Sequence, residues 1–178
     1  MKKKTILDLD RDSIDTYRSK PKIGRTVGLD NVRSLNNIGS VFRTADAFLI
    51  DRIMLCGISA TPPSPEIHKT ALGAEDSVEW HDFPTTAECL DLLESEGCEV
   101  CCLEQVERRI ALQDFTPDPS RRYALVLGHE VDGVGQEVVD RAAHSIEIPQ
   151  AGTKHSLNVS VAAALAMWHF FNCLHLKQ

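Results

Sequence analysis

Residues 148–160 read Ile148-Pro149-Gln150-Ala151-Gly152-Thr153-Lys154-His155-Ser156-Leu157-Asn158-Val159-Ser160. The stretch opens with a proline, crosses a small polar patch and enters an apolar-striped helix, with Ser156 and Asn158 at its expected start. Free main-chain N–H groups at a helix start, beside short polar side chains, suit a carboxylate or another polar ligand group. Serine and asparagine are also favoured as plain helix caps, so this stretch alone leaves both interpretations open.

The composition is that of an ordinary globular protein with one substantial core. The chain has 178 residues, of which 43% are hydrophobic and 25% charged, and this length suits a single α/β domain. The longest unbroken apolar run, residues 161–168, is too short to span a membrane. Asp8 and Asp10 interrupt the apolar region near the N-terminus, so we expect no export signal and a cytoplasmic protein.

The six cysteines lie mostly in apolar segments that are typical of core strands. In a cytoplasmic protein they should be reduced thiols. Cys98 and Cys101 have the spacing of a metal or redox pair, but no second pair stands at metal-ligand spacing. Residues three apart on a strand also point to opposite faces. Because the seven histidines show no metal-binding spacing either, we expect core cysteines and no metal.

Charge is distributed unevenly along the chain, whose net charge is −7. Residues 1–25 carry eight Lys or Arg and four Asp, whereas no Lys or Arg lies between Lys69 and Arg108, a span with eleven carboxylates. An acidic body repels phosphate. Any nucleic acid should therefore be held elsewhere. A basic N-terminal arm at residues 1–22 is the first candidate, although such a run is often only a solvated terminus.

Strand-like and helix-like segments alternate along most of the chain. Strands are expected at residues 25–29, 52–56, 99–103, 123–127 and 145–148. Helices are expected at residues 36–48, 85–96, 136–142 and 156–173, and residues 59–76 should be a long loop with at most one helical turn. In the last helix the expected core stripe is Leu157, Val161, Leu165 and Trp168. The alternation predicts an α/β domain with a mainly parallel sheet flanked by helices, and ligands at the carboxyl ends of its strands.

A glycine-rich turn, Leu127-Gly128-His129-Glu130-Val131-Asp132-Gly133-Val134-Gly135, follows the most apolar of these strands. Its glycines allow close approach of the main chain and positive φ angles. The turn matches neither the dinucleotide-binding pattern GxGxxG nor a phosphate-binding P-loop. Glu130 is its unusual element, because a carboxylate directly after a buried strand costs free energy unless a hydrogen-bond donor meets it.

Another polar segment, nearer the N-terminus, lies on the first expected helix of the domain and reads Asn37-Ile38-Gly39-Ser40-Val41-Phe42-Arg43-Thr44-Ala45-Asp46-Ala47. The guanidinium of Arg43 could reach a phosphate or pair with a carboxylate such as that of Glu130. The alternative is an ordinary surface ion pair, or an arginine whose stem only covers apolar neighbours.

Taken in order, these motifs resemble those of the SpoU (TrmH-like) family, RNA ribose 2′-O-methyltransferases of the SPOUT class. The first motif is N-x-G-x-x-x-R, the second is L-G-x-E-x-x-G-V and the third is I-P-x-x-G-x-x-x-S-L-N-V-S-x-A. The similarity runs from about Arg25 to the C-terminus. The resemblance implies a parallel α/β fold with a C-terminal trefoil knot, although chain threading is normally excluded. It also implies a homodimer with its active site near the subunit interface, and S-adenosylmethionine as methyl donor.

The resemblance also assigns roles to individual residues. The donor-binding positions correspond to Leu103, Gln105, Leu127, Gly128, Ile148, Ser156 and Leu157. The catalytic arginine corresponds to Arg43, and the supporting polar positions correspond to Asn37, Glu130, Ser156 and Asn158.

The proposed chemistry fits these side chains. In-line methyl transfer depends on positioning, and a ribose hydroxyl must lose its proton, yet a guanidinium is a poor base. Our hypothesis is that Arg43 grips the adjacent phosphate and the hydroxyl, that Glu130 and Asn37 orient Arg43, and that Asn158 and Ser156 frame donor and ribose. His129 is an alternative base, because its ordinary pKa suits neutral pH.

The expected organisation is a basic arm or short helix, residues 1–22, before a methyltransferase domain, residues 23–178. RNA would be held by this arm, by Arg33, Arg43 and Lys154, and by dimerisation. The sequence leaves open whether the substrate is tRNA or rRNA. Two rival readings remain: a non-catalytic knotted dimer that binds RNA or an adenosine-type ligand, and a methyltransferase of the same class that acts on a base. A generic nucleotide-binding enzyme is disfavoured by the missing GxGxxG and P-loop.

Overall fold

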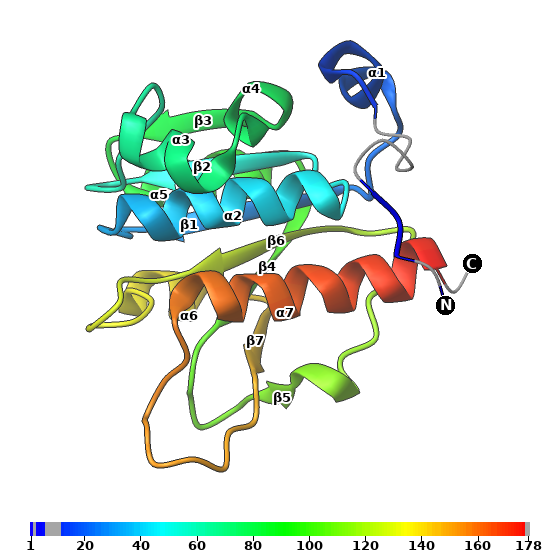
Figure 1. Cartoon of the computed structure of the whole chain (residues 1–178). Helices are drawn as coiled ribbons and strands as arrows, with labels where there is room; N and C mark the ends of the chain where they lie inside the picture. Colours follow the sequence, from blue (N-terminus) through cyan, green and yellow to red (C-terminus); the bar gives the residue numbers. More distant parts are fainter. Residues whose placement is uncertain (2, 6–11, 177–178) are drawn as a thin grey trace.

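The computed structural model describes residues 1, 3–5 and 12–176, and its centre is a parallel sheet (Figure 1). Within these residues seven strands pair in the order β3-β2-β1-β6-β4-β7-β5, and every pair is parallel. The strands are β1 (Arg25–Asp30), β2 (Arg52–Cys56), β3 (Glu79–Phe83), β4 (Cys98–Leu103), β5 (Ile110–Ala111), β6 (Arg122–Leu127) and β7 (His144–Glu147). The predicted parallel α/β fold is therefore confirmed.

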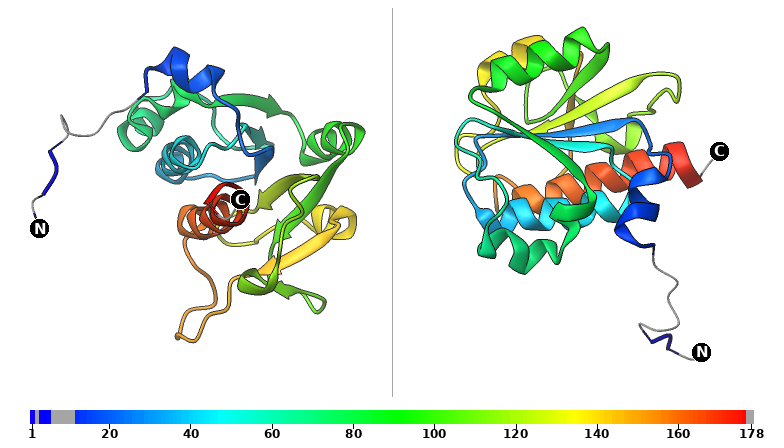
Figure 2. Two further views of the ribbon diagram at one scale, coloured as in Figure 1. Left: turned by 90° about the vertical axis from the view of Figure 1, so that its right-hand side faces the viewer. Right: turned by 90° about the horizontal axis from the view of Figure 1, so that it is seen from above.

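Helices cover both faces of this sheet. They are α1 (Ile14–Ser19), α2 (Leu35–Ala47), α3 (Pro65–Ala71), α4 (Ala74–Ser77), α5 (Thr86–Ser95), α6 (Gln136–Arg141) and α7 (Val159–Phe171), with short turns at Leu112–Asp114 and Asn172–Leu176. Figure 2 shows α2 and α7 side by side on one face and α5 and α6 on the other. Because every strand pair is parallel, all loops that leave the carboxyl ends of the strands lie along one side of the sheet. We call this side the carboxyl edge, and the side where the strands begin the amino edge.

Alternation along each strand builds a core on both faces. On β6, Leu125 packs in the large cluster under α2 and α7, whereas Val126 packs in a separate cluster under α5 and α6. On β4, Cys98 and Cys101 belong to different clusters, as their spacing predicted. All six cysteines are free thiols, and five of them are buried.

The first region that differs from the sequence-based prediction is residues 59–76. In place of a long loop, the chain forms the two-turn helix α3 and the short helix α4. The start of α3 carries a normal signal, since the hydroxyl of Ser64 accepts from the main-chain N–H of Ile67, and Pro65 occupies the first turn. Strand β3 was also not predicted, because its half-exposed sequence lacks a clear apolar pattern.

Helix α7 corrects two further expectations. It begins at Val159 with Asn158 as its cap, so Ser156 precedes the helix. Its expected core stripe is wrong: the relative exposures are 37% for Leu157, 48% for Val161, 41% for Leu165 and 46% for Trp168. The buried face is instead formed by Val159, Ala163, Ala166, Met167 and Phe170. Because α7 is apolar nearly all round, periodicity could not choose its face, and the small alanines allow close packing there.

Helix α1 lies within the range expected to be an arm or short helix, and it docks on the domain. Tyr17 is buried in the main core, and the guanidinium of Arg18 donates to the main-chain oxygen of Asp76 at 2.5 Å. The expected arm at residues 1–22 therefore contains a packed portion. Its other basic residues fall partly outside the described residues, which exclude Lys2 and residues 6–11.

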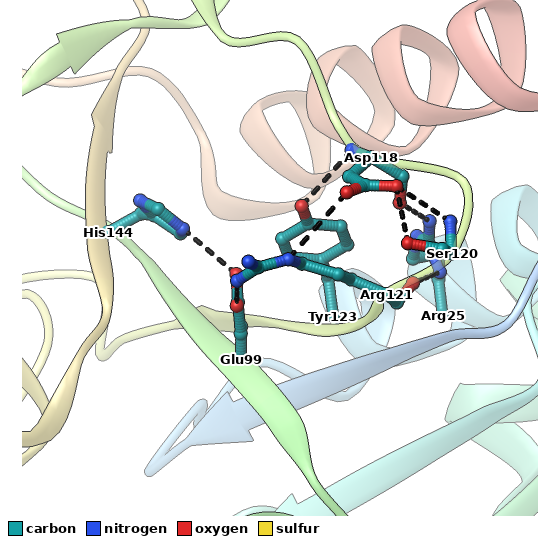
Figure 3. Close-up of polar contacts among 7 residues, drawn as sticks. All are labelled: Arg25, Glu99, Asp118, Ser120, Arg121, Tyr123 and His144. Carbon is teal, nitrogen blue, oxygen red and sulfur yellow. Dashed lines mark hydrogen bonds and ion pairs between the residues drawn. The ribbon is translucent and has the colours of Figure 1, made fainter.

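A closed polar cluster occupies the amino ends of the strands (Figure 3). Arg25 is only 2% exposed, and its guanidinium donates to the main-chain oxygens of Gly24 at 2.6 Å and Arg121 at 2.7 Å. It also lies 4.7 Å from the centre of the Tyr123 ring. Burial lowers the pKa of Arg25. The cluster fastens β1 to the turn that precedes β6.

Candidate functional site

A pocket of about 480 Å³ opens at the carboxyl ends of β4, β6 and β7. All seven residues predicted to bind the donor line it: Leu103, Gln105, Leu127, Gly128, Ile148, Ser156 and Leu157. Glu130 and Asn158, two of the predicted catalytic residues, line it as well. The structure thus brings the second and third sequence motifs together around one cavity, where a parallel sheet is expected to bind its ligand.

The glycine-rich turn that forms one wall of the pocket is tightly closed. His129 and Gly133 exchange two main-chain hydrogen bonds, of 2.9 and 3.0 Å. A Cβ atom at Gly128 would lie 2.1 Å from the main-chain carbon and oxygen of Gly133, a distance at which the main chain itself must move. The glycine at position 128 is therefore required by contact between two main-chain segments.

Glu104 supports this wall and was missed by the sequence-based prediction. Its carboxylate accepts from the main-chain N–H of Gln105 at 2.7 Å and of Val134 at 2.9 Å. It thereby joins the end of β4 to the turn after β6, and it lines the pocket. The available signal was the same as for Glu130, a carboxylate immediately after a buried strand, which requires donors.

Glu130 is held by the start of α2. Its carboxylate accepts from the main-chain N–H groups of Arg33 at 3.2 Å and Ser34 at 3.0 Å, and from the side-chain amide of Asn37 at 3.2 Å. Burial by itself would raise the pKa of Glu130, but these hydrogen bonds outweigh it and leave the pKa below its usual value. A permanent negative charge is thus fixed at the rim of the pocket, as the expected need for donors implied.

Asn37 joins the first motif to the third. Its side-chain oxygen accepts from the amide of Asn158 at 3.1 Å. The oxygen of Asn158 in turn accepts from the main-chain N–H of Ser160 at 2.9 Å and so caps α7. Asn158 is therefore the helix cap that the sequence allowed, and it also lines the pocket. One chain of hydrogen bonds connects Glu130, Asn37 and Asn158.

The loop between β7 and α7, residues 149–158, is exposed along its whole length. One side-chain hydrogen bond ties its middle to the body: the amide of Gln105 donates to the main-chain oxygen of His155 at 2.7 Å. Gln105 is thus a structural tie as well as a lining residue. Lys154 is exposed on the same loop, in a position to meet a ligand from solvent.

Arg43 stands apart from the pocket in the single chain. It is exposed on α2 and forms no hydrogen bond or ion pair with the described part of the chain, so the expected contact with Glu130 and Asn37 is not made here. Arg43 follows Asn37 by six residues, which places it about 9 Å further along the axis and roughly 240° around the helix. The carboxylate of Glu130 is meanwhile engaged at the start of α2.

His129 lies between the pocket and the rest of the turn. Its Nδ1 atom accepts from the main-chain N–H groups of Val131 and Asp132, each at 3.2 Å, and its side chain is mostly buried. The Nδ1 atom is therefore engaged within its own turn. With Nδ1 as the acceptor, the neutral ring carries its proton on Nε2, so in this arrangement His129 offers no free lone pair for the alternative role of base.

The lining of the pocket is acidic. It includes the carboxylates of Glu104, Glu130, Asp132 and Glu147, and no lysine or arginine of the described residues belongs to it. Glu147 forms an ion pair with Arg109, which lies outside the lining. Such a cavity favours a neutral or cationic ligand over a phosphate.

Comparisons with known proteins agree with this geometry. Residues 24–168 match the SpoU rRNA Methylase family. A Staphylococcus haemolyticus protein named as a TrmH family tRNA/rRNA methyltransferase is 29% identical over 91% of this chain and 64% of its own length. A solved structure from Porphyromonas gingivalis, described as an RNA methyltransferase of the TrmH family, is 30% identical over 83% of this chain and 59% of its own, with a TM-score of 0.73.

A third similar protein was solved with its ligand. The AdoMet-bound rRNA methyltransferase from Sinorhizobium meliloti is 26% identical, with a TM-score of 0.76, over 88% of this chain and 58% of its own. The chain spans less than two thirds of the length of these three proteins. The similarity therefore concerns the sheet, its helices and the pocket described above.

Proposed function

The chain belongs to the SpoU rRNA Methylase family, and from this premise we propose that it transfers a methyl group from S-adenosylmethionine to a ribose 2′-hydroxyl of tRNA or rRNA. The observation that carries the proposal is the convergence of three separated motifs on one cavity. The second and third motifs line it, and the first is joined to both through Asn37.

The cavity fits the methyl donor. Its volume of about 480 Å³ suits a small molecule, and Gly128, whose main chain packs closely against that of Gly133, is one of its lining residues. The acidic lining, which holds no lysine or arginine from the part of the chain that the structure describes, suits a cationic sulfonium. S-adenosylmethionine, when bound, supplies an electrophilic methyl group on this sulfonium. We assign its binding to Leu103, Gln105, Leu127, Gly128, Ile148, Ser156 and Leu157.

The polar side chains at the rim would position the ribose. Glu130, Asn37 and Asn158 form a fixed set of donors and acceptors whose geometry does not depend on a ligand. Preorganised polar groups of this kind lower a barrier because they need no rearrangement during the reaction. Arg43 would bind the phosphate next to the target and hold the hydroxyl, with Ser156 beside the donor.

A second copy of the chain would explain the exposed stripe on α7. Val161, Leu165 and Trp168 are each more than 40% exposed, and the ring of Trp168 lies 5.5 Å from that of Phe48 at the end of α2. We propose that the stripe forms a homodimer interface. Because Arg43 is exposed on α2, which packs along α7, the second copy would also face Arg43 and complete the site.

An alternative cover for this stripe is a membrane. Residues Val159–Leu176 are long and apolar enough to cross one by length and composition alone. The packing of α7 is instead that of a core helix, with Ala166, Met167 and Phe170 fully buried against the domain. We therefore favour a second copy in the cytoplasm. The C-terminal trefoil knot remains a prediction from the family resemblance.

RNA would approach an acidic body through a few basic residues. Arg33, next to Glu130, and Lys154, on the exposed loop, lie on the pocket side of the sheet. Together with the docked portion of the basic arm, these residues would bind RNA with an affinity that decreases as the salt concentration rises. We infer no preference between tRNA and rRNA.

Incubation of the protein with labelled S-adenosylmethionine and total RNA tests the proposal. Nuclease digestion of the product should yield 2′-O-methyl nucleosides. Arg43→Ala should lower the rate at least about 100-fold without loss of donor binding, whereas Lys69→Ala, an exposed cation on α3, should not change it. Methylated bases would indicate the base-modifying alternative, and donor or RNA binding without transfer would indicate the non-catalytic one.

The dimer is tested separately by Trp168→Glu. A buried glutamate without a partner is strongly unfavourable in an apolar interface, so light scattering should show a monomer that remains folded. A wild-type protein that is monomeric at micromolar concentration would contradict the proposed interface.

A further inference from the structure

A second cavity, of about 540 Å³, lies at the same edge of the sheet and is not used by the proposed reaction. It opens where the loops after β1 and β6 separate, and α5 borders it. Neighbouring parallel strands whose connections run in opposite directions leave a crevice at this point, a common position for a ligand. The turn 129–133 is its wall toward the donor pocket, since His129, Asp132 and Gly133 line both cavities.

The floor of this cavity is fixed by a buried carboxylate. Asp30 is 3% exposed and accepts from the hydroxyl of Thr86 at 2.6 Å, the amide of Asn31 at 2.8 Å and the main-chain N–H of Gly135 at 2.8 Å. These bonds join β1 to the starts of α5 and α6. The cavity thus has a defined shape without a ligand.

Asn31 and Gly57 hold the opposite wall of this cavity in place. Asn31 has a φ of 57°, and its side-chain oxygen accepts from the main-chain N–H of Ile58 at 3.1 Å. A Cβ atom at Gly57 would lie 2.1 Å from that oxygen. The turn after β2 is therefore held against the turn after β1, which leaves Ile58 projecting with 63% of its surface exposed.

The chemistry of the lining selects the kind of occupant. Among residues 1, 3–5 and 12–176, no lysine or arginine lines the cavity, whereas Asp132 and Glu137 do, so a phosphate is disfavoured. Glu137 lies 3.6 Å from Arg141, a long ion pair that leaves acceptor capacity. Ile58 and Pro84 add apolar surface for a flat ring. An uncharged planar group with N–H donors on its edge satisfies all of these features.

We propose that this cavity binds a nucleobase of the substrate RNA that flanks the methylated nucleotide, with a preference for bases that carry an exocyclic amino group. Adenine, cytosine and guanine offer such donors to carboxylates, whereas uracil offers one ring N–H. The cavity adjoins the donor pocket through the turn 129–133, so one strand can enter both. The proposal rests on the proposed function in that it names RNA as the ligand.

Binding of single-stranded hexanucleotides to the full chain tests the proposal directly. Fluorescence anisotropy at low salt would compare oligo(A), oligo(C) and oligo(U), and calorimetry would measure binding of S-adenosylmethionine to the same samples. The variants are Ile58→Ala and Glu137→Gln, both at exposed positions that the fold does not need. Glu88→Gln, an exposed carboxylate on α5 outside the cavity lining, is the matched control.

The wild type should bind oligo(A) and oligo(C) about fivefold more tightly than oligo(U), the size of one hydrogen bond. Glu137→Gln should remove most of this preference, and Ile58→Ala should weaken all three oligonucleotides. Glu88→Gln should behave as the wild type, and donor binding should not change in any variant. Equal affinity for the three oligonucleotides, or variants that match the control, would overturn the proposal.

Two further outcomes separate this inference from the proposed function. If Glu137→Gln weakens binding of S-adenosylmethionine, the cavity belongs to the donor, and the inference is wrong while the proposed function stands. If the wild type transfers no methyl group but keeps the base preference that Glu137→Gln removes, the inference stands as RNA binding and the proposed function is wrong.

Discussion

The two edges of the sheet hold their polar side chains in opposite ways. At the amino ends, Arg25 is buried, donates to main-chain oxygens and packs on aromatic rings. Around it, Arg121 and His144 both contact Glu99 (Figure 3). The described part of this cluster satisfies itself, with only the Nε atom of Arg25 left without a partner.

At the carboxyl ends, polar groups are arranged around two cavities. Glu130 and Asn158 are exposed on the pocket side, and the half-buried Asn37 forms a hydrogen bond with each of them. Asp30 and Glu104 use their carboxylates to shape the walls. From this difference we propose that the amino edge stabilises the domain and that the carboxyl edge binds ligands. Substitutions at the two edges should therefore change different measurements.

The largest effect is expected from Arg25→Ala. It leaves a cavity between Tyr123 and Phe170 and removes the donor from at least two buried oxygens, so the free energy of unfolding should fall by about 4 kcal/mol. Urea unfolding measures it. Arg122→Ala, an exposed arginine on the same edge, should cost less than about 1 kcal/mol. A loss of donor affinity in folded Arg25→Ala would show that the two edges are coupled, against the comparison.

Gly128→Ala should have the next largest effect, at the other edge. The new methyl group would meet the main chain of Gly133, so the turn must move, and donor affinity should fall about 30-fold or more. Gly28→Ala, whose Cβ would meet only a side-chain methyl of Val126 at 3.2 Å, should keep donor affinity. Calorimetry distinguishes them. Unchanged donor binding in Gly128→Ala would remove this turn from the donor site.

The sequence predicted the carboxyl edge better than the packing around it. The residues of the second and third motifs could be placed at strand ends because alternation of strands and helices implies where such loops gather. The buried face of α7 could not be predicted, because nearly every position of that helix is apolar and only its neighbours decide which side is covered. The local sequence pattern determines whether a segment forms a helix or a strand, but contacts with distant segments determine which of its faces is buried.

Single residues with long-range roles were missed for the same reason. Glu104 acts through Val134, thirty residues away, and Asp30 acts through Gly135, more than a hundred residues away. No local spacing relates these pairs. Arg43 shows the converse: its motif was read correctly as part of α2, but helix geometry separates it from Asn37, and the role we propose for it therefore depends on RNA or a second copy of the chain.

Asn37→Ala tests whether the hydrogen bonds among Glu130, Asn37 and Asn158 at the carboxyl edge serve turnover and not donor binding. It breaks the link between Glu130 and Asn158, so turnover should fall about tenfold, the size of a hydrogen bond to a charged group, while donor affinity stays within about twofold. Asn37→Asp should be worse than alanine, because it places a second carboxylate beside Glu130. Asn36→Ala, the exposed neighbour, is the control. An aspartate variant as active as the wild type would contradict a positioning role for the amide.

The smallest effect is a pH dependence that separates the two edges. Burial, and then the nearby charge of Arg121, lower the pKa of His144 below 6.5. The contact with Glu99 would favour the charged form, but Arg121 shares that carboxylate. As the pH falls below 6.5, the unfolded chain binds the proton first. The stability that the neutral imidazole contributes is therefore present above 6.5 and lost as the pH falls through the folded pKa.

Urea unfolding between about pH 7.5 and about pH 5 should show a decline in the free energy of unfolding that is shallower in His144→Asn. The negative charge at the rim of the donor pocket should not change over this range, because the pKa of Glu130 is lowered from its usual value of 4.5 and its carboxylate stays charged. The wild type should thus lose stability at a pH where its pocket still binds the donor. A parallel loss of donor affinity in folded protein, abolished by His144→Asn, would mean that the amino edge controls the pocket and that the division between the edges is wrong.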